Sequence, residues 1–223
     1  MKIKPYAVGS IGTNSYLVWD EESGEAMLVD PGAFEPAIER EIAESGLSLK
    51  YIALTHGHGD HIGGVKGFQA AHPGALLAAG AGEAGFLGDA EQNGSQMFFG
   101  EKIALAPDVL LGEGDGLLLG ALRFCVIETP GHTPGGVAFY IAEADRALTG
   151  QAFSGTAFTG DTLFRASVGR TDLAGGDFAA LGDSIRNKLF ALPDDTLVLP
   201  GHMDATTIGF ERKHNPFVRG SAD

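Results

Sequence analysis

Short apolar runs recur along the chain, and most of them end in a turn that contains glycine or proline. Runs rich in β-branched and aromatic residues are typical of strands, and the turn residues mark where those strands end. The pattern predicts strands, several with the turn that follows them, over residues 15–20, 26–30, 50–56, 122–132, 136–143, 156–161 and 196–202.

Other segments repeat apolar residues at the spacing of an α-helix. Residues 34–46 fit a helix that ends at a glycine, and residues 177–192 fit an amphipathic helix. The apolar face of the second helix is expected to consist of Phe178, Leu181, Ile185 and Leu189. A short helix is expected over residues 206–214, and the weak pattern of residues 80–112 predicts loops with short helices.

The domain organisation follows from this order of elements. The sequence contains no linker-like stretch and no repeat of the length found in solenoid proteins. A chain of 223 residues with 44% hydrophobic residues is long enough to bury a sizeable core. We therefore expect an α/β protein with a single domain over residues 1–223.

The charge of the chain narrows the classes of partner. The formal net charge of −14 at pH 7 repels phosphate backbones and anionic lipids, so neither nucleic acid nor a membrane is an expected partner. The first residues lack the continuous apolar stretch of a signal peptide, and no apolar run approaches the length of a membrane span. The only cysteine, Cys125, cannot form an intrachain disulfide, so the cytoplasm is the expected location. A monomer or a small homo-oligomer is expected.

The stretch LTHGHGDHIGG at residues 54–64 contains the highest density of potential metal ligands, because three histidines and an aspartate directly follow a predicted strand. Imidazole nitrogens and carboxylate oxygens are ligands of zinc, iron and manganese. In an extended or tightly turned loop, His56 and His58 point the same way and can share one ion. Asp60 and His61 then project to a neighbouring position. The glycines keep the backbone thin and permit unusual φ and ψ values, so the stretch predicts a metal cradle and favours two ions.

Three further polar residues follow predicted strands in the same way. They are His132 in TPGHTPGG, Asp161 in FTGD and His202 in LPGH. Because strand ends on one edge of a sheet lie near each other, these residues are expected to join the first four at one site. His72 and His214 lack such company, and ordinary surface or core positions are expected for them.

The motifs THGHGDH, PGHTPGG, TGD and PGH, in this order, resemble those of the metallo-β-lactamase superfamily, and the resemblance covers nearly the whole chain. The stretches GDTLFRASVGRTDLAGGD and TTIGFERKHNPF further resemble the short glyoxalase II-like enzymes, which are hydroxyacylglutathione hydrolase-like proteins. The resemblance implies a four-layer αββα sandwich with the metal ions at one edge of the two sheets.

The same resemblance implies a role for each candidate ligand. The first metal would be held by His56, His58 and His132, the second by Asp60, His61 and His202, and Asp161 would bridge both. Two divalent ions are thus implied, with zinc as the expected metal and iron or manganese as alternatives. A water between the ions would lose a proton near neutral pH. The resulting metal-bound hydroxide, beside the catalytic carboxylates Asp60 and Asp161, would attack a carbonyl carbon.

The activity implied by the resemblance is hydrolysis of a small anionic thioester of the S-acylglutathione type. A thioester suits such a site because a thiolate leaves easily, so no strong general acid is needed. The metal would stabilise the oxyanion of the tetrahedral intermediate. No serine or cysteine nucleophile is required, and the sequence contains no G-x-S-x-G elbow.

The sequence departs from the larger glyoxalase II enzymes near the substrate. The sequence ends with KHNPFVRGSAD, so no C-terminal helical glutathione-binding domain is expected. Arg170 stands where those enzymes have a lysine, and Asp172 stands where they have an aromatic residue. Arg170 fits two roles, a clamp for a substrate carboxylate or a structural arginine paired with Asp172 or Asp177. Met203 stands where relatives often have glycine, and a narrower cleft beside His202 is expected from it.

A second activity fits the same residues. Persulfide dioxygenases share this fold and a GRTD stretch, and they use one iron held by the equivalents of His56, His132 and Asp161. Metal content and oxygen uptake would separate the two activities. A metal-dependent ribonuclease is disfavoured by the acidic charge and by the lack of a basic arm, and a non-enzymatic scaffold is disfavoured because every expected ligand is present.

Overall fold

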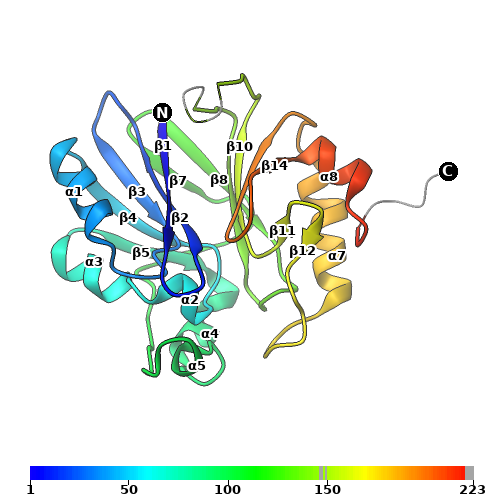
Figure 1. Ribbon diagram of the computed structural model, residues 1–223, viewed down its shortest axis with the longest axis horizontal. Helices are drawn as coiled ribbons and strands as arrows, with labels where there is room; N and C mark the ends of the chain where they lie inside the picture. Colours follow the sequence, from blue (N-terminus) through cyan, green and yellow to red (C-terminus); the bar gives the residue numbers. More distant parts are fainter. Residues whose placement is uncertain (146–147, 149, 219–223) are drawn as a thin grey trace.

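Two six-stranded β-sheets stacked face to face form the centre of the molecule in the computed structural model, which describes residues 1–145, 148 and 150–218 (Figure 1). Helices cover the outer face of each sheet, so the layers follow in the order helix, sheet, sheet, helix. The four-layer αββα sandwich of the metallo-β-lactamase fold is therefore confirmed.

The first sheet takes its strands from the N-terminal half of the chain. They are β1 (Lys2–Val8), β2 (Thr13–Trp19), β3 (Glu25–Val29), β4 (Ser48–Leu54), β5 (Leu76–Gly80) and β6 (Val109–Leu111). The strands lie side by side in sequence order, antiparallel from β1 to β3 and parallel from β3 to β6. Parallel neighbours need crossover connections, and α1 (Pro36–Glu44) and α3 (Val65–Ala71) provide two of them.

The second sheet has the order β14-β13-β10-β9-β8-β7. Its strands are β7 (Gly116–Leu119), β8 (Leu122–Glu128), β9 (Val137–Ile141), β10 (Thr156–Gly160), β13 (Leu197–Pro200) and β14 (Thr206–Thr207). Only β10 and β13 are parallel, and α7 (Phe178–Asn187) lies between them in the sequence. A small hairpin, β11 (Leu163–Phe164) and β12 (Ser167–Val168), follows β10 directly.

The remaining helices are short. They are α2 (Gly59–Ile62), η1 (Ala81–Glu83), α4 (Ala84–Gly88), α5 (Ser95–Phe99), η2 (Leu189–Ala191) and α8 (Ile208–His214). Of these, η1, α4 and α5 lie within residues 80–112, which were expected to contain loops with short helices, and α2 lies within the histidine-rich stretch at residues 54–64. None of the helices among the described residues is both long enough and apolar enough to span a membrane.

Three hydrophobic clusters hold the four layers together. The cluster between the sheets includes Tyr16 of β2 and Phe158 of β10, whose rings meet edge to face with their centroids 5.3 Å apart. Ile38 and Ile42 of α1 pack into the cluster on the outer face of the first sheet. The cluster on the outer face of the second sheet contains Ile185 of α7. Each sheet is thus buried on both faces, which explains the continuous apolar runs in its central strands.

The local signals in the sequence account for the two long helices. Pro36 stands at the start of α1, and the Glu35 carboxylate accepts a hydrogen bond from the backbone N–H of Ala37. The Asp177 carboxylate caps α7 by accepting from the N–H groups of Ala179 and Ala180. The predicted apolar face of α7 is wrong at Phe178, which is 54% exposed because it is the first residue of the helix and precedes the buried residues, which begin at Leu181.

Candidate metal centre

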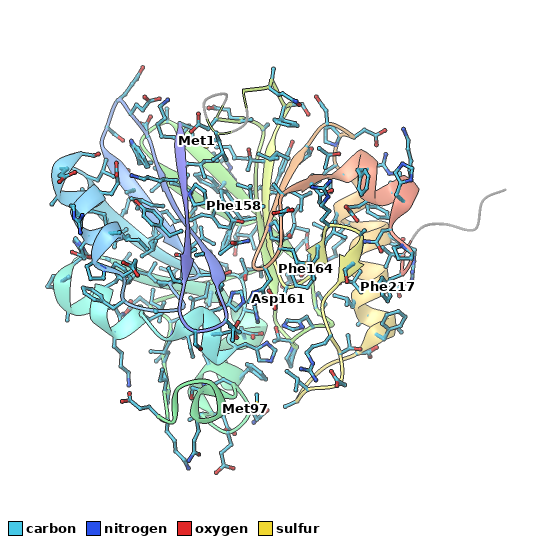
Figure 2. The ribbon with its side chains drawn as sticks, in the orientation of Figure 1. Met1, Met97, Phe158, Asp161, Phe164 and Phe217 are labelled. Carbon is cyan, nitrogen blue, oxygen red and sulfur yellow. The ribbon has the colours of Figure 1, made fainter. Side chains whose placement is uncertain are left out.

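The seven predicted ligands meet at one edge of the sandwich, where the two sheets approach each other. The strands β4, β8, β10 and β13 all end at this edge, and the loops after them carry the ligands. Asp161, labelled in Figure 2, directly follows β10. The strand-end placement expected from the sequence therefore brings residues more than a hundred positions apart into contact, as His202 and Asp60 show with a separation of 142 positions.

The first group of side chains consists of His56, His58 and His132. One ligand atom from each lies within 4.8 Å of the other two, and all three side chains are buried. The Nδ1 atom of His58 lies 2.9 Å from Nε2 of His132. This is the set that the resemblance assigns to the first metal.

The second group consists of Asp60, His61 and His202. Its ligand atoms also lie within 4.8 Å of one another, with Asp60 and His61 buried and His202 half-buried. Nε2 of His202 lies 3.1 Å from Asp60 Oδ2, and Nε2 of His61 lies 3.5 Å from the same oxygen. This is the set assigned to the second metal.

Asp161 lies between the two groups. Its Oδ2 atom is 3.6 Å from Nε2 of His132, in the first group, and 3.7 Å from Nε2 of His202, in the second. Its Oδ1 atom is 3.3 Å from Nε2 of His61. A carboxylate that faces members of both groups has the position required of a bridging ligand.

Several ligand atoms of this cluster make no hydrogen bond with any described residue. They are the buried Nε2 atoms of His56 and His61 and Oδ1 of Asp161, of which the last two lie 3.3 Å from each other. Nε2 of His58 is also buried without a hydrogen bond, whereas its Nδ1 atom faces His132. Buried polar atoms are almost always paired, because an unpaired one costs about 1–3 kcal/mol. Nitrogen and oxygen donors without protein partners, gathered around two adjacent points, fit two divalent ions of the zinc, iron or manganese type.

The hydrogen bonds on the far side of each ring fix which nitrogen carries the proton. Nδ1 of His132 lies 2.7 Å from the backbone oxygen of Arg170, which can only accept, so this nitrogen donates. Nδ1 of His61 likewise donates to Asp30 Oδ2 at 3.0 Å. The Thr55 hydroxyl already donates to Asp30, at 2.6 Å, so it accepts from Nδ1 of His56 at 3.1 Å. In the neutral form of each of these three rings the proton lies on Nδ1, so the lone pair of Nε2 is the one available to a metal.

The electrostatics of the two groups differ. Burial lowers the pKa of His58 to about 3, and it also lowers the pKa values of His56 and His132, so these rings are neutral donors near pH 7. Burial acts in the same direction on His61, but the carboxylates of Asp161, Asp60 and Asp30 outweigh it and raise the pKa of His61. The second group thus has the stronger attraction for positive charge.

Asp30 supports the cluster without being a predicted ligand. Asp30, His56 and His61 also form a compact group, but both carboxylate oxygens of Asp30 already accept hydrogen bonds, from the Thr55 N–H at 2.8 Å, the Thr55 hydroxyl and the His61 ring. Asp30 adopts a φ of +48°, a left-handed conformation that aspartate tolerates better than most residues. It orients the rings rather than offering a free donor atom.

Glu83 was not identified from the sequence, although it connects both loops of the first group. Its side chain is fully buried, and Oε1 accepts from the Gly57 N–H at 2.8 Å, between His56 and His58. Oε2 accepts from the Thr133 hydroxyl at 3.1 Å and from the Gly135 N–H at 2.8 Å, just after His132. Burial raises the pKa of Glu83, and these three donors oppose that rise. A lone glutamate in a segment of weak pattern gives no sequence signal for such a role.

Strand β2 organises the second group. The Thr13 hydroxyl donates to Asp60 Oδ2 at 3.1 Å. The Asn14 side-chain amide donates to the backbone oxygens of Pro200 and Met203, at 3.1 and 2.9 Å, and so fixes both sides of the His202 loop. These contacts join the two sheets at the site.

The glycines of the motif act by size rather than by conformation. The glycines were expected to keep the backbone thin and to permit unusual φ and ψ values, and neither Gly57 nor Gly59 has a positive φ. A Cβ on Gly57 would instead lie 3.0 Å from side-chain atoms of Phe86 and Leu87. At Gly201, just before His202, a Cβ would likewise overlap Asp161 Oδ1 and the His61 ring.

Arg170 makes a bidentate ion pair with Asp172. Its Nε and Nη2 atoms donate to the two carboxylate oxygens at 2.7 and 2.8 Å, and both side chains are exposed. The hydrogen bond from Arg170 lowers the pKa of Asp172 to about 2, so the pair stays charged near neutral pH. Of the pairings expected from the sequence, the structure contains the one with Asp172, whereas Asp177 caps α7.

The two other histidines lie apart from the cluster. His72 Nε2 lies 2.9 Å from Glu39 Oε1, and the His214 ring packs against Phe210 with centroids 4.9 Å apart. Both residues therefore have ordinary surroundings.

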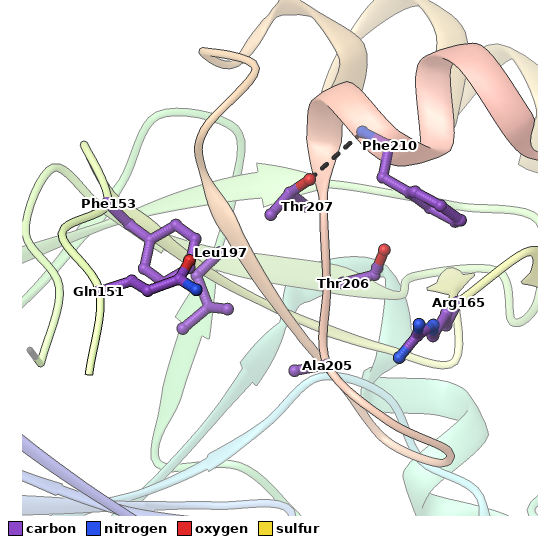
Figure 3. A pocket seen from close by; sticks show the side chains of 8 residues that line it. All are labelled: Gln151, Phe153, Arg165, Leu197, Ala205, Thr206, Thr207 and Phe210. Carbon is purple, nitrogen blue, oxygen red and sulfur yellow. Dashed lines mark hydrogen bonds between the residues drawn. The ribbon is translucent and has the colours of Figure 1, made fainter. Parts of the chain in front are cut away.

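A cavity of about 340 Å³ opens onto the metal centre, within the size range of small-molecule sites. Its walls include five of the seven predicted ligands together with Ile11, Phe164, Ser167, Val168, Arg170, Leu173 and Met203. A larger cavity of about 440 Å³ lies beside β14 (Figure 3). None of the seven ligands lines that cavity, so the smaller one is the candidate active site.

The chain is similar to known proteins along its full length. Residues 8–155 and 151–202 match the family model described as the metallo-beta-lactamase superfamily. The chain is 36% identical to the hydroxyacylglutathione hydrolase GloC of Haemophilus influenzae, over 100% of both chains. It is 32% identical to the mitochondrial persulfide dioxygenase ETHE1 of Mus musculus, over 92% of this chain and 70% of that protein.

Two solved structures have the same fold at similar levels of identity. The BLEG-1 B3 metallo-beta-lactamase gives a TM-score of 0.85 at 37% identity, over 98% of this chain and 100% of that one. The di-iron-bound form of TTHA1623 gives 0.76 at 35% identity, over 96% and 99%. Because both similarities extend over nearly the full length of each chain, nearly the whole fold has a counterpart in each of these two structures.

If the two groups each hold an ion, removing ligands should change metal content in a defined way. His58→Ala should lower the metal content from two ions per chain to one, and Asp161→Ala should weaken both positions because its carboxylate faces both groups. Elemental analysis of protein purified without added metal measures the ratio. His72→Ala is the matched control and should keep both ions. An unchanged ratio in His58→Ala would contradict the assignment.

Glu83→Gln should weaken metal binding at the first group. Glutamine must place an NH₂ group against one of the three donors that Glu83 now accepts, so the loops carrying His58 and His132 lose a common anchor. Substitutions that disturb ligand orientation in this way typically cost about 10–100-fold in metal affinity. Titration against a competing chelator measures the loss.

Glu211→Gln provides the control, because Glu211 is equally buried and accepts from Ala166 N–H, Thr206 and Asn215, away from the first group. It should destabilise the fold comparably while leaving metal affinity nearly unchanged. Equal losses of affinity in both variants would reduce Glu83 to a general stabilising residue.

Proposed function

The chain belongs to the metallo-beta-lactamase superfamily and is a metal-dependent hydrolase of that superfamily, and we propose that its substrates are small thioesters of the S-acylglutathione type. The observation that carries the proposal is the presence of two complete donor groups with Asp161 between them, in a chain similar over its full length to GloC.

The residues of the cavity suit hydrolysis of a thioester. When bound, a pair of divalent ions would lower the pKa of a coordinated water and polarise the substrate carbonyl. The three rings of the first group offer neutral lone pairs near pH 7. Burial tends to raise the pKa values of Asp60 and Asp161, but the neighbouring histidines lower both, so both remain charged carboxylates near pH 7. A thiolate needs little protonation to leave, since thiols have a pKa of about 8.5.

An anionic substrate would meet one cation in the cavity wall outside the metal groups, Arg170. Arg170 is already engaged with Asp172, so it would bind a substrate carboxylate by exchanging one partner for another. The expectations of a cytoplasmic monomer or small homo-oligomer that binds neither nucleic acid nor membrane stay predictions.

The alternative is a persulfide dioxygenase-like activity at a single iron. It is supported by the similarity to ETHE1 and by the proximity of His132 and Asp161, at 3.6 Å, within the triad His56, His132 and Asp161. The second donor group of Asp60, His61 and His202 has no task in a one-iron site, and its completeness favours the hydrolase.

The test is a pair of assays on the same metal-loaded protein. S-lactoylglutathione should be hydrolysed, the activity should disappear on chelation and return with zinc, iron or manganese, and glutathione persulfide should cause no oxygen uptake. His58→Ala should abolish the hydrolysis, and His72→Ala should not. Oxygen uptake without thioester hydrolysis would replace the proposal by the dioxygenase.

The role of Arg170 can be decided with Asp172→Asn, which releases the guanidinium from its partner. If Arg170 binds a substrate carboxylate, KM for an anionic thioester should fall roughly two- to fivefold in Asp172→Asn and rise by a similar factor in Arg170→Ala. These factors are small because the group is exposed and screened by solvent. KM for a neutral thioester should stay the same in both variants.

Arg186→Ala is the control, since it removes an exposed arginine that is paired with Asp183 on α7, outside the cavity wall. Equal losses on charged and neutral substrates, together with a lower melting temperature in Arg170→Ala, would show that the pair is structural.

A further inference from the structure

Two exposed apolar side chains flank the metal centre, and each comes from a different sheet. Ile11 lies in the turn between β1 and β2 and is 51% exposed, and Met203 follows β13 and is 60% exposed. Both line the 340 Å³ cavity, together with the apolar residues Phe164, Val168 and Leu173. The part of the wall that lies outside the metal ligands is therefore mostly apolar.

Met203 occupies a backbone conformation that favours glycine. Its φ of +66° lies in the left-handed region, where a side chain with a Cβ is strained. The backbone is fixed there by the hydrogen bond from Asn14 Nδ2 to the Met203 oxygen, at 2.9 Å. Strained residues of this kind concentrate at functional sites. Glycine would relieve the strain, so the methionine side chain is retained at a cost to the fold while remaining largely exposed.

Ile11 is presented in a comparable way from the other sheet. The turn that carries it has glycines at positions 9 and 12, each with a φ of +70°. These glycines adopt the left-handed conformations that the turn requires, so Ile11 itself does not need a positive φ. An isoleucine at such a tip contributes little to the core, since half of it faces solvent.

Outside the candidate metal ligands, the polar residues of the cavity wall carry little net charge. Arg170 is bonded through two nitrogens to Asp172, so the net charge of that pair is zero. The apolar residues and the candidate metal ligands line the same cavity. A thioester that reacts there would place the substituent on its carbonyl carbon or on its sulfur against Ile11 and Met203.

From these observations we propose that Met203 and Ile11 are specificity-determining residues, which select thioesters that carry an apolar substituent of a few carbons. The inference rests on the proposed thioesterase function and adds the class of substrate. Each methylene taken fully out of water favours binding roughly fourfold, and in an open cavity about two- to fourfold is expected.

The experiment measures kcat/KM of the metal-loaded protein along two series of neutral thioesters. One series lengthens the acyl group from acetyl to butyryl to hexanoyl on N-acetylcysteamine, and the other lengthens the thiol of simple alkyl thioacetates. We expect kcat/KM to rise about two- to fourfold per methylene in the series whose substituent contacts the wall. The gain should shrink by at least half in Met203→Ala, Met203→Gly and Ile11→Ser.

Two comparisons show whether Met203 acts on substrate specificity or on the stability of the fold. Met203→Gly should keep or raise the melting temperature because it relieves the left-handed strain, whereas a methionine that serves the fold would make the temperature fall. Met97→Ala is the matched control, since Met97 is an equally exposed methionine, at 68%, outside the cavity wall. It should leave the chain-length dependence unchanged.

A further readout needs no turnover. Calorimetric binding of acetate, butyrate and hexanoate to the metal-loaded protein should strengthen with chain length in the wild type and less in Met203→Ala. If no thioester is hydrolysed, the proposed function fails, and the carboxylate series still decides the specificity. If thioesters are hydrolysed but neither series nor the carboxylates depend on chain length, the specificity proposal is overturned and the proposed function stands.

Discussion

Burial of charged and polar donor atoms at the edge shared by the two sheets is the constraint from which the rest of this structure follows. An isolated buried carboxylate costs several kcal/mol, and here Asp30, Asp60 and Asp161 lie within one cluster of imidazoles. The His61 ring faces all three carboxylates, which explains its raised pKa. Even so, several donor atoms remain unpaired, and metal ions are the partners whose chemistry matches them.

The positions of these side chains depend on how firmly the sheets and the loops at their edge are held together. The inter-sheet core around Phe158 fixes the two sheets, and short polar connections then fix the loops at their edge. Glu83 holds the two loops of the first group together, and Asn14 holds the His202 loop against β2. These residues belong to neither candidate ligand group, yet they determine the distances between the atoms of those groups.

Backbone strain collects around the same edge. The non-glycine residues with positive φ among the described residues are Asp30, Ala166 and Met203. Asp30 orients His61, Met203 follows His202, and Ala166 lies in the β11–β12 turn, whose flanking residues Phe164 and Ser167 line the cavity. Each such residue costs about 1–3 kcal/mol, which the well-packed core between the sheets offsets. The strain is thus concentrated where side chains must point at the metals or at a ligand.

The sequence alone determined the candidate ligand set, because four of its seven residues fall within His56–His61 and the others each follow a strand and a glycine. The layer order came from the resemblance of these motifs to a known family, since the strand pattern by itself does not determine the topology. The continuous apolar runs likewise identified β2, β3, β4, β8, β9, β10 and β13. Strands β1, β5, β6 and β7 and the two-residue strands β11, β12 and β14 were missed, since their patterns are short or interrupted by proline and glycine.

Tertiary structure decided which residues support and surround that ligand set. Glu83, Asp30 and Asn14 act through partners up to 189 positions away, as the bond between Asn14 and Met203 shows, and no local pattern encodes such a distance. The pairing of Arg170 with Asp172 rather than Asp177 depended on the capping of α7. A sequence fixes which donor atoms are present and how neighbouring ones are spaced. Only the packing of two sheets decides which distant side chains complete their hydrogen bonds.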